Sequence, residues 1–162
     1  MVDIKLVNKV SDELKKHQVT IATAESCTGG LLAHTLTNVS GSSDYFDRGV
    51  ICYSNTAKIE LLGIRVQLLE NFGAVSKQVA AAMAKTIQQR SKVDIGIATT
   101  GIAGPTGGTK NKPVGLVFIG IAIKDTVIVK EFLFSGDRLT NKDSTCTAAL
   151  ELLLETISQN KG

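Results

Sequence analysis

The sequence predicts an α/β fold, a three-layer α/β/α sandwich with a mixed, mostly parallel sheet in a single domain over residues 1–162. Short apolar runs of strand length alternate with segments of helical spacing, which is typical of βαβ units. Two β-rich runs, 114–123 and 126–134, are separated only by Lys124-Asp125, which predicts a hairpin and hence antiparallel pairs. A last helix over 150–157 completes the layers, and no linker or repeat divides the chain.

The first part of the chain is expected to alternate helix, strand and helix. Apolar residues recur at helical spacing from Ile4 to Leu14 and predict an amphipathic helix. Residues 19–24 are continuously apolar or small, as in a buried strand, and a helix follows two glycines from Leu31 onward. Residues 40–44 form a loop by composition.

The middle of the chain continues the same alternation. A short strand is predicted over 50–53, and Ser54 is a suitable cap for a helix that reaches Leu62. Apolar residues at helical spacing predict a long helix over 76–91. The run 95–99 is a third strand, which leads into a glycine-rich loop.

Composition limits the classes of function. The net charge is +3 with scattered basic residues, and only 4% of the residues are aromatic, with no tryptophan, which disfavours base stacking and nucleic-acid partners. No apolar stretch is long enough to span a membrane, and the N-terminus lacks the apolar segment of a signal peptide. We therefore expect a cytoplasmic protein that acts on a small anionic molecule.

Cysteine and histidine content disfavours a metal site. Three cysteines lie far apart, without a CxxC pair, which is typical of a reducing compartment: Cys27, Cys52 and Cys146. With only two histidines there is little material for zinc, so neither a metal nor another cofactor is predicted.

The segment TAESCTGG at 23–30 places three candidate nucleophiles or ligands where a strand turns into a helix. Ser26 at this turn could be a helix N-cap, whose oxygen accepts a backbone N–H. Position alone favours the cap. The same geometry also suits a nucleophile at a ligand-facing sheet edge, where a helix N-terminus offers donors to an oxyanion. Gly29 and Gly30 would let a substrate approach the backbone closely.

A nucleophilic serine needs a base, and the histidines are poorly placed to supply one. His17 lies near the end of the first helix, and His34 lies two turns into the helix after Ser26, pointing away from the turn. Lysine is the other known base when its pKa is depressed. If strands 19–24 and 50–53 are neighbours, Lys58 lies at the same edge as Ser26, although most lysines are simply solvated.

The loop 100–108, TGIAGPTGG, contains four glycines and a proline. Such a loop prescribes backbone turns and exposes N–H groups that can hold phosphate or carboxylate. Its pattern matches neither GxxxxGK[ST] nor GxGxxG, which excludes the common nucleotide loops. A purely structural loop is the alternative.

With these residues assembled, the chain resembles the CinA C-terminal family, whose stand-alone members are nicotinamide mononucleotide deamidases. The resemblance covers about residues 5–157. Its motifs are TAESCTGG at 23–30, YSNTAK at 53–58, GAVS at 73–76 and TGIAGPTGGTKNKPVG at 100–115.

The resemblance implies an amidohydrolase that acts on a linear carboxamide by a Ser-Lys mechanism, without a cofactor, in pyridine nucleotide salvage. It implies Ser26 as the nucleophile and Lys58 as its general base, with Tyr53 beside them. It implies that Thr100 and Gly101 line the pocket with Tyr53 and that Arg138 helps to hold the substrate. The complete set of residues that we predict to bind substrate is Thr28, Gly29, Gly30, Thr100, Gly101, Gly104, Arg138 and Lys142. A homodimer would suit the family.

Two positions depart from the family pattern. A second arginine usually follows four residues after Arg138, where this chain has Lys142. Lysine keeps the charge but loses the bidentate fork for phosphate or carboxylate. A glycine is usual at the position of Arg48. Both departures concern ligand affinity more than the reaction.

Two other hypotheses remain at this point. One is a catalytically inactive paralogue that binds the nucleotide, or acts as an interaction module, and releases no ammonia. The other places the nucleophile on Cys27, for which no histidine is placed as an activating base.

Overall fold

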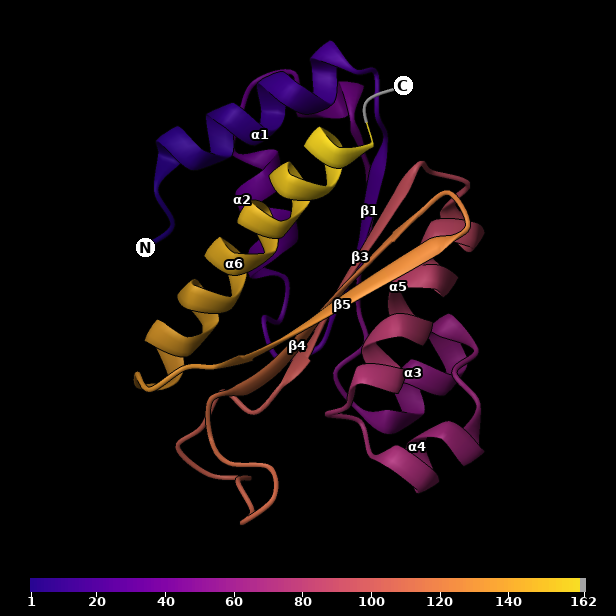
Figure 1. The fold of residues 1–162 in the computed structure, drawn as a ribbon, viewed down its shortest axis with the longest axis vertical. Coiled ribbons are helices and arrows are strands. Elements are labelled where there is room, and N and C mark those ends of the chain that lie inside the picture. The colour runs from indigo at the N-terminus through magenta and orange to yellow at the C-terminus, as the bar shows by residue number, and fades with distance from the viewer. Residues whose placement is uncertain (161–162) are drawn as a thin grey trace.

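Five strands form one mixed sheet at the centre of the molecule (Figure 1). The computed structural model describes residues 1–160. The strands are β1 (Ile21–Glu25), β2 (Phe46–Ile51), β3 (Ile95–Gly101), β4 (Leu116–Ile123) and β5 (Thr126–Leu133). They lie in the order β2-β1-β3-β4-β5. Strand β1 runs parallel to β2 and β3, while β3–β4 and β4–β5 are antiparallel, which confirms the mixed sheet and the hairpin.

Helices cover both faces of the sheet, which confirms the three-layer sandwich (Figure 1). One face carries α1 (Ile4–Lys16), α2 (Leu31–Thr37) and α6 (Arg138–Gln159). The other carries α3 (Asn55–Leu62), α4 (Val66–Phe72) and α5 (Lys77–Ser91). A single 3₁₀ turn, Ser42–Asp44, lies in the predicted loop before β2.

Each face of the sheet has its own apolar core. Leu14, Leu36 and Leu153 belong to the cluster beneath α1, α2 and α6, and Met83 belongs to the cluster beneath α5. Helix α5 lies unusually close to the sheet: a Cβ added at Gly96 would stand 2.2 Å from a helix carbonyl oxygen. Only glycine allows this approach, so the packing of α5 requires it.

Two elements have other bounds than the sequence predicts, and one helix was not predicted. Strand β2 begins at Phe46, four residues before the predicted 50–53. It ends at Ile51 rather than at Tyr53, because the chain leaves the sheet early to place Ser54 as the N-cap of α3, where its Oγ accepts the Ala57 N–H at 2.9 Å. Helix α4 was not predicted, since seven residues between turns give little periodicity. Helix α6 begins about three turns before the predicted 150–157, because its first turns are polar.

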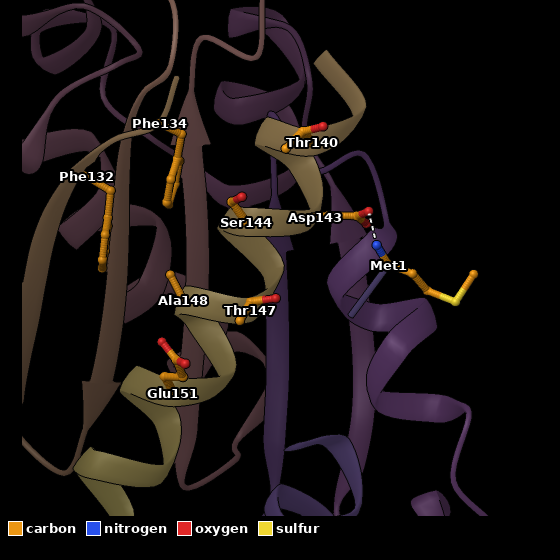
Figure 2. Close-up of a pocket in the computed structure, with 9 residues that line it drawn as sticks. All are labelled: Met1, Phe132, Phe134, Thr140, Asp143, Ser144, Thr147, Ala148 and Glu151. Atoms are coloured by element: carbon orange, nitrogen blue, oxygen red, sulfur yellow. Dashed lines mark hydrogen bonds and ion pairs between the residues drawn. The ribbon is translucent and has the colours of Figure 1, made fainter. Parts of the chain in front are cut away.

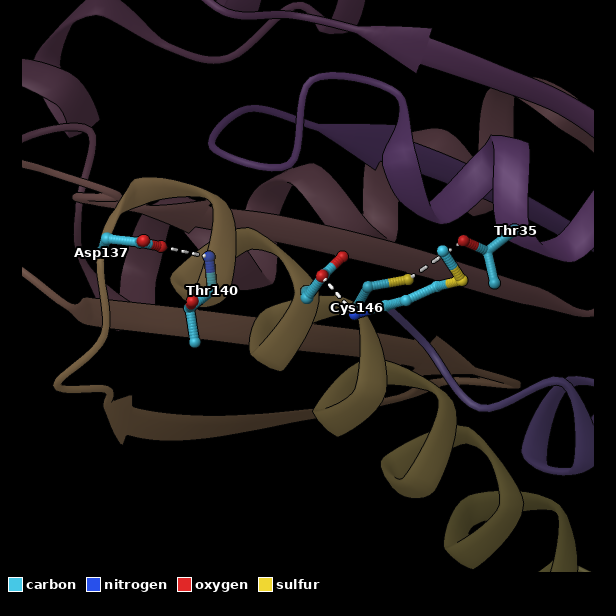
Figure 3. A network of polar contacts seen from close by, with 6 residues as sticks. Thr35, Asp137, Thr140 and Cys146 are labelled. Atoms are coloured by element: carbon cyan, nitrogen blue, oxygen red, sulfur yellow. Dashed lines mark hydrogen bonds and ion pairs between the residues drawn. The ribbon is translucent and has the colours of Figure 1, made fainter.

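The early start of α6 has a local cause, shown in Figure 3. The Asp137 carboxylate accepts the N–H of Thr140 at 2.8 Å and so caps the helix. The same hydrogen bond holds the pKa of Asp137 below its usual value. Further along, the Cys146 thiol lies 3.5 Å from the Thr35 hydroxyl and links α6 to α2. The cap thereby determines where Arg138 begins the helix.

Candidate active site

The candidate site lies at the edge of the sheet where β1, β2 and β3 end together. In the parallel registers Glu25 of β1 is opposite Ile51 of β2 and Thr99 of β3. The turns that follow these strands therefore meet at one edge, as expected for a ligand site in a sheet of this kind. The expectation that the strands containing residues 24 and 50 are neighbours is confirmed.

A serine and a lysine face each other at this edge. The Nζ atom of Lys58 lies 3.0 Å from the Oγ atom of Ser26, although the two residues are 32 positions apart in the chain. Ser26 is 7% exposed and Lys58 is 1% exposed. The distance is that of a nucleophile and its base.

Two carbonyl groups hold the amine of Lys58. The carbonyl oxygens of Cys52 and Tyr53 each lie 3.0 Å from its Nζ atom. Burial lowers the pKa of Lys58 below the usual lysine value. As an ammonium, Lys58 donates to both carbonyls and to Ser26 Oγ. When the amine is neutral it has two N–H donors and one lone pair; the carbonyls can only accept, so the two donors can go to them and leave the lone pair for Ser26. This arrangement suits proton transfer from the Ser26 hydroxyl to Lys58.

Ser26 is not the N-cap of the following helix, so that interpretation of the sequence is wrong. Helix α2 begins at Leu31, five residues later, and Gly30 occupies the cap position with φ = 100° and no side-chain hydrogen bond. The Ser26 hydroxyl instead contacts Lys58 and, at 3.5 Å, the carbonyl oxygen of Tyr53. It is therefore free of any helix-capping role.

Glu25 satisfies the first N–H groups of α2. Its carboxylate accepts the N–H of Gly30 at 3.0 Å, of Leu32 at 3.1 Å and of Ala33 at 2.7 Å. The sequence analysis missed this role because a carboxylate after an apolar strand is usually solvated. The available signal was Thr28, three residues on, whose hydroxyl donates to the same carboxylate at 2.6 Å. The N-terminus of α2 thus offers no free donor of the kind expected for an oxyanion.

Two other N–H groups near Ser26 have no hydrogen-bond acceptor. Those of Cys27 and Thr28 have no oxygen acceptor within residues 1–160. The N–H of Gly29 donates to the Ser26 carbonyl at 3.1 Å and is therefore occupied. Thr28 has no exposed surface, whereas Cys27 is 5% exposed, so the Cys27 N–H is the better placed of the two to meet an oxyanion at Ser26.

Arg138 connects two of the predicted binding segments. Its guanidinium donates to the Tyr53 hydroxyl at 2.8 Å and to the Gly104 carbonyl at 2.7 Å. Lys142, one turn further along α6, lies beside the turn of residues 26–30: its Nζ would be 3.5 Å from a Cβ added at Gly29. Within the part of the chain that the structure describes, neither basic residue forms an ion pair. Both charges border the site and suit an anionic group.

Other residues predicted for binding support the site from beneath. The Thr28 hydroxyl is fully buried and lies 2.8 Å from that of Thr99. The Thr100 hydroxyl donates to the Ala74 carbonyl at 2.8 Å and ties β3 to the segment before α5. A Cβ added at Gly101 would stand 2.8 Å from the Leu116 carbonyl oxygen. The hydroxyls of Thr28 and Thr100 therefore bond to neighbouring parts of the fold, and Gly101 permits close packing of β3 against β4.

A cavity of about 460 Å³ lies elsewhere, between α6 and the end of β5 (Figure 2). Phe132 and Phe134 line one side, and the amine of Met1 pairs with Asp143 at 2.6 Å on the other. It contains none of the residues predicted for chemistry. In residues 1–160 no group of three or more His, Cys, Asp or Glu side chains could hold a metal ion, and no helix is long and apolar enough to cross a membrane.

Comparison with known proteins gives the family. Residues 3–157 match the CinA C-terminal domain. The chain belongs to the CinA C-terminal domain family. A CinA-like protein of Chloroherpeton thalassium is 47% identical over 160 residues, which are 96% of this chain and 38% of that protein. A protein of Caldicellulosiruptor saccharolyticus named as competence-damage inducible is 53% identical over 148 residues, 91% of this chain and 36% of that protein. The chain thus spans little more than a third of the length of these curated relatives.

Solved structures agree with this CinA domain over nearly its whole length. The competence/damage inducible protein CihA of Agrobacterium tumefaciens superposes with a TM-score of 0.92 at 38% identity, covering 96% of this chain and 97% of that one. The competence damage-inducible protein A of Klebsiella pneumoniae gives a TM-score of 0.95 at 31% identity, covering 99% and 100%. The fold and the family are therefore shown together.

The two departures of this CinA domain from the family pattern lie in different places. Lys142 borders the turn of residues 27–30, as described above. Arg48 lies in β2 opposite Ala22, three positions before the strand end, is exposed and pairs with its neighbour Asp47. Lys142 is therefore the departure that can change ligand binding.

The sequence analysis did not identify Asn141, which supports the glycine-rich loop of this CinA domain. Its buried amide donates to the Ala103 carbonyl at 3.0 Å, and its carbonyl oxygen accepts the N–H of Gly136 at 2.9 Å. Its position, three residues after Arg138 on one face of α6, was the only available signal.

Cys27 is expected to be dispensable for catalysis. Burial raises the pKa of its thiol to about 12, so the reactive thiolate is scarce at neutral pH. We expect Cys27→Ala to keep its turnover within about 3-fold of the wild type, since the substitution removes a buried thiol and leaves the backbone N–H in place. Steady-state rates of the purified variant give the result. Loss of activity in Cys27→Ala combined with normal turnover by Ser26→Ala would instead assign the nucleophile to Cys27.

Proposed function

We propose that this CinA domain is a nicotinamide mononucleotide deamidase, which hydrolyses the carboxamide to nicotinic acid mononucleotide and ammonia. Ser26 Oγ attacks the carboxamide carbon while its proton moves to Lys58 Nζ. The N–H of Cys27, which has no other oxygen acceptor in residues 1–160, meets the oxyanion. Ammonia leaves with the proton from Lys58, and a water molecule, deprotonated by the same amine, then hydrolyses the acyl-enzyme.

The observation that carries the proposal is the buried Ser26–Lys58 pair. An amine 3.0 Å from a serine hydroxyl, with its pKa lowered by burial and its donors directed at two carbonyls, has no evident structural purpose. Such perturbed groups concentrate at functional sites. The bordering cations Arg138 and Lys142 suit a substrate that carries a phosphate.

The test is release of ammonia from nicotinamide mononucleotide by the purified protein. We expect one ammonia and one nicotinic acid mononucleotide per substrate consumed, with no release from free nicotinamide at the same concentration. Binding of the mononucleotide without release of ammonia would favour the inactive paralogue instead. Treatment with a chelator should leave the rate unchanged, because the proposed steps use only side chains and backbone groups.

The phosphate of the substrate is expected to contribute to the rate as well as to affinity. Arg138 and Lys142 lie apart from Ser26 in sequence and border the same site, so binding of a remote phosphate can orient the carboxamide. We expect nicotinamide riboside to have a kcat/KM at least about 100-fold below that of the mononucleotide, the size of effect that loss of substrate orientation produces. Steady-state kinetics with both substrates give the comparison.

Variants at the two cations localise this effect. Arg138→Ala should lower kcat/KM for the mononucleotide and leave that for the riboside nearly unchanged. Lys142→Arg should tighten binding of the mononucleotide by supplying two parallel hydrogen bonds. Equal specificity constants for the two substrates in the wild type would contradict the phosphate contact.

A further inference from the structure

Glu25 connects the parts of the candidate site and is itself almost inaccessible. The side chain is 1% exposed, although it carries a carboxyl group. Its two carboxylate oxygens have five donors within hydrogen-bond distance: the hydroxyls of Thr23 and Thr28 and the N–H groups of Gly30, Leu32 and Ala33. Burying a carboxyl is costly unless its oxygens are satisfied in this way.

The donors come from both sides of the turn that contains the nucleophile. Thr23 precedes Ser26, whereas Thr28, Gly30 and the first residues of α2 follow it. The carboxylate therefore connects the end of β1 to the start of α2 by hydrogen bonds and holds the turn of residues 26–30 between them. Gly29 and Gly30 take φ values of 61° and 100°, and these allow the tight turn.

This arrangement leaves two N–H groups unused. The N–H of Gly30 bonds to the carboxylate and that of Gly29 to the Ser26 carbonyl, while those of Cys27 and Thr28 find no oxygen within residues 1–160. Without Glu25, the first donors of α2 would lose their acceptor, and the turn would reorganise to satisfy them. The direction of the free pair of donors thus depends on the carboxylate.

The backbone of Glu25 also positions the base. Its carbonyl oxygen accepts the N–H of Cys52 at 2.9 Å, one residue beyond the end of β2. The carbonyl of Cys52 in turn accepts from Lys58 Nζ. One residue therefore holds the nucleophile turn through its side chain and the lysine through its main chain.

We propose that Glu25 is a positioning residue for the reaction: its carboxylate holds the turn of residues 26–30 so that Ser26 faces Lys58 and the N–H of Cys27 faces the substrate. This inference rests on the proposed function only for the identity of the substrate. The geometry applies to any acyl transfer at Ser26.

The main test uses Glu25→Gln, which keeps the size of the side chain but replaces one acceptor oxygen with a donor. The control is Asp3→Asn, the same change in the carboxylate that caps α1, where Asp3 accepts the Lys5 N–H at 2.9 Å. We expect Glu25→Gln to lower kcat for the mononucleotide about 100-fold, the cost of misplacing reacting groups by about 1 Å. Asp3→Asn should react at the wild-type rate.

Two further readouts separate positioning from loss of stability. The KM should stay within about 3-fold of the wild type, because Arg138 and Lys142 lie on α6. The pH at half-maximal rate should also stay, since burial rather than Glu25 lowers the pKa of Lys58. A general loosening of the fold would change KM and this pH together with kcat.

A second assay does not depend on the substrate. The reagent is a fluorophosphonate, which phosphonylates activated serines, and the product is measured by intact mass. One group should be added to the wild type and none to Ser26→Ala. Glu25→Gln should react about 100-fold more slowly than the wild type. If the wild type is labelled but releases no ammonia from the mononucleotide, the proposed function fails and the role of Glu25 stands. A wild type that is not labelled and also releases no ammonia would overturn both.

Thr28 keeps the proposal testable if Glu25→Gln does not fold. Thr28→Val removes one donor to the carboxylate with little change of shape, and Thr28→Ser restores the hydroxyl. Slower phosphonylation of Thr28→Val, recovered in Thr28→Ser, would support the proposal. Labelling at the wild-type rate by folded Glu25→Gln, or by Thr28→Val when Glu25→Gln is unfolded, would overturn it.

Discussion

Ser26→Ala is expected to lose turnover of nicotinamide mononucleotide by at least about 10⁴-fold, as when the nucleophile of a serine hydrolase is removed. The thiols at this edge of the sheet cannot replace the hydroxyl, because burial raises the pKa of Cys27 to about 12 and that of Cys52 to about 11. Ammonia release measured at high enzyme concentration gives the residual rate. Activity of Ser26→Ala near that of the wild type would remove the acyl-enzyme from the mechanism.

The same variant should remain folded, which makes its inactivity interpretable. Because Glu25 and not Ser26 satisfies the first donors of α2, the substitution removes no helix cap. Lys58 keeps its two carbonyl acceptors. We expect the free energy of unfolding to change by about 1 kcal/mol, the usual net value of one hydrogen bond. Denaturant unfolding of both proteins gives this difference.

Lys58→Arg is expected to be nearly as inactive as Lys58→Ala. A guanidinium stays protonated at every pH in which the protein is folded, so it has no lone pair for the Ser26 proton. Lysine in a buried site can lose its proton, and the two carbonyls around Nζ leave that lone pair directed at Ser26. Steady-state kinetics on both variants, with circular dichroism to verify folding, provide the measurement.

The pH profile tests the same lysine in the wild type. Burial lowers the pKa of Lys58, so its neutral form persists to a lower pH than that of an ordinary lysine. As the pH falls through this lowered value, the amine takes up a proton and kcat/KM should decline. Substantial turnover by Lys58→Arg, or a rate that rises on acidification, would exclude lysine as the base.

The sequence predicts that Ser26 and Lys58 lie at one edge of the sheet, because each follows a strand and the two strands, β1 and β2, are neighbours. Apolar runs located β1 and β3 to within two residues, and the parallel register of β1 and β2 brings Ser26 and Lys58 to one edge. The sequence could not predict what holds the lysine. That depends on Cys52 and Tyr53 lying outside β2, so that their carbonyls turn toward α3.

The role of Glu25 in holding the turn of residues 26–30 could not be predicted from the sequence, for a different reason. Ser26 has the residue type and the position of an N-cap, and local preference favours that interpretation. A non-local arrangement prevails, in which Glu25 reaches past Ser26 to α2. Whether the Glu25 carboxylate bonds to α2 or to water depends on its complete burial, which a single sequence does not reveal. The same holds for Asn141, whose partner Ala103 lies on the distant glycine-rich loop.

The burial of Lys58 links the stability of the fold to pH. In the unfolded chain the amine has its usual pKa of 10.5, whereas burial lowers the pKa in the folded chain. Between these two values the unfolded chain binds a proton that the folded chain does not, so the free energy of unfolding decreases as the pH falls and levels off below the lower value. At neutral pH the burial of Lys58 therefore lowers the stability of the domain. Lys58→Met, with a side chain of similar length, would remove the amine and this loss of stability together. Its melting temperature should exceed that of the wild type at neutral pH, and the difference should decrease as the pH approaches 10.5.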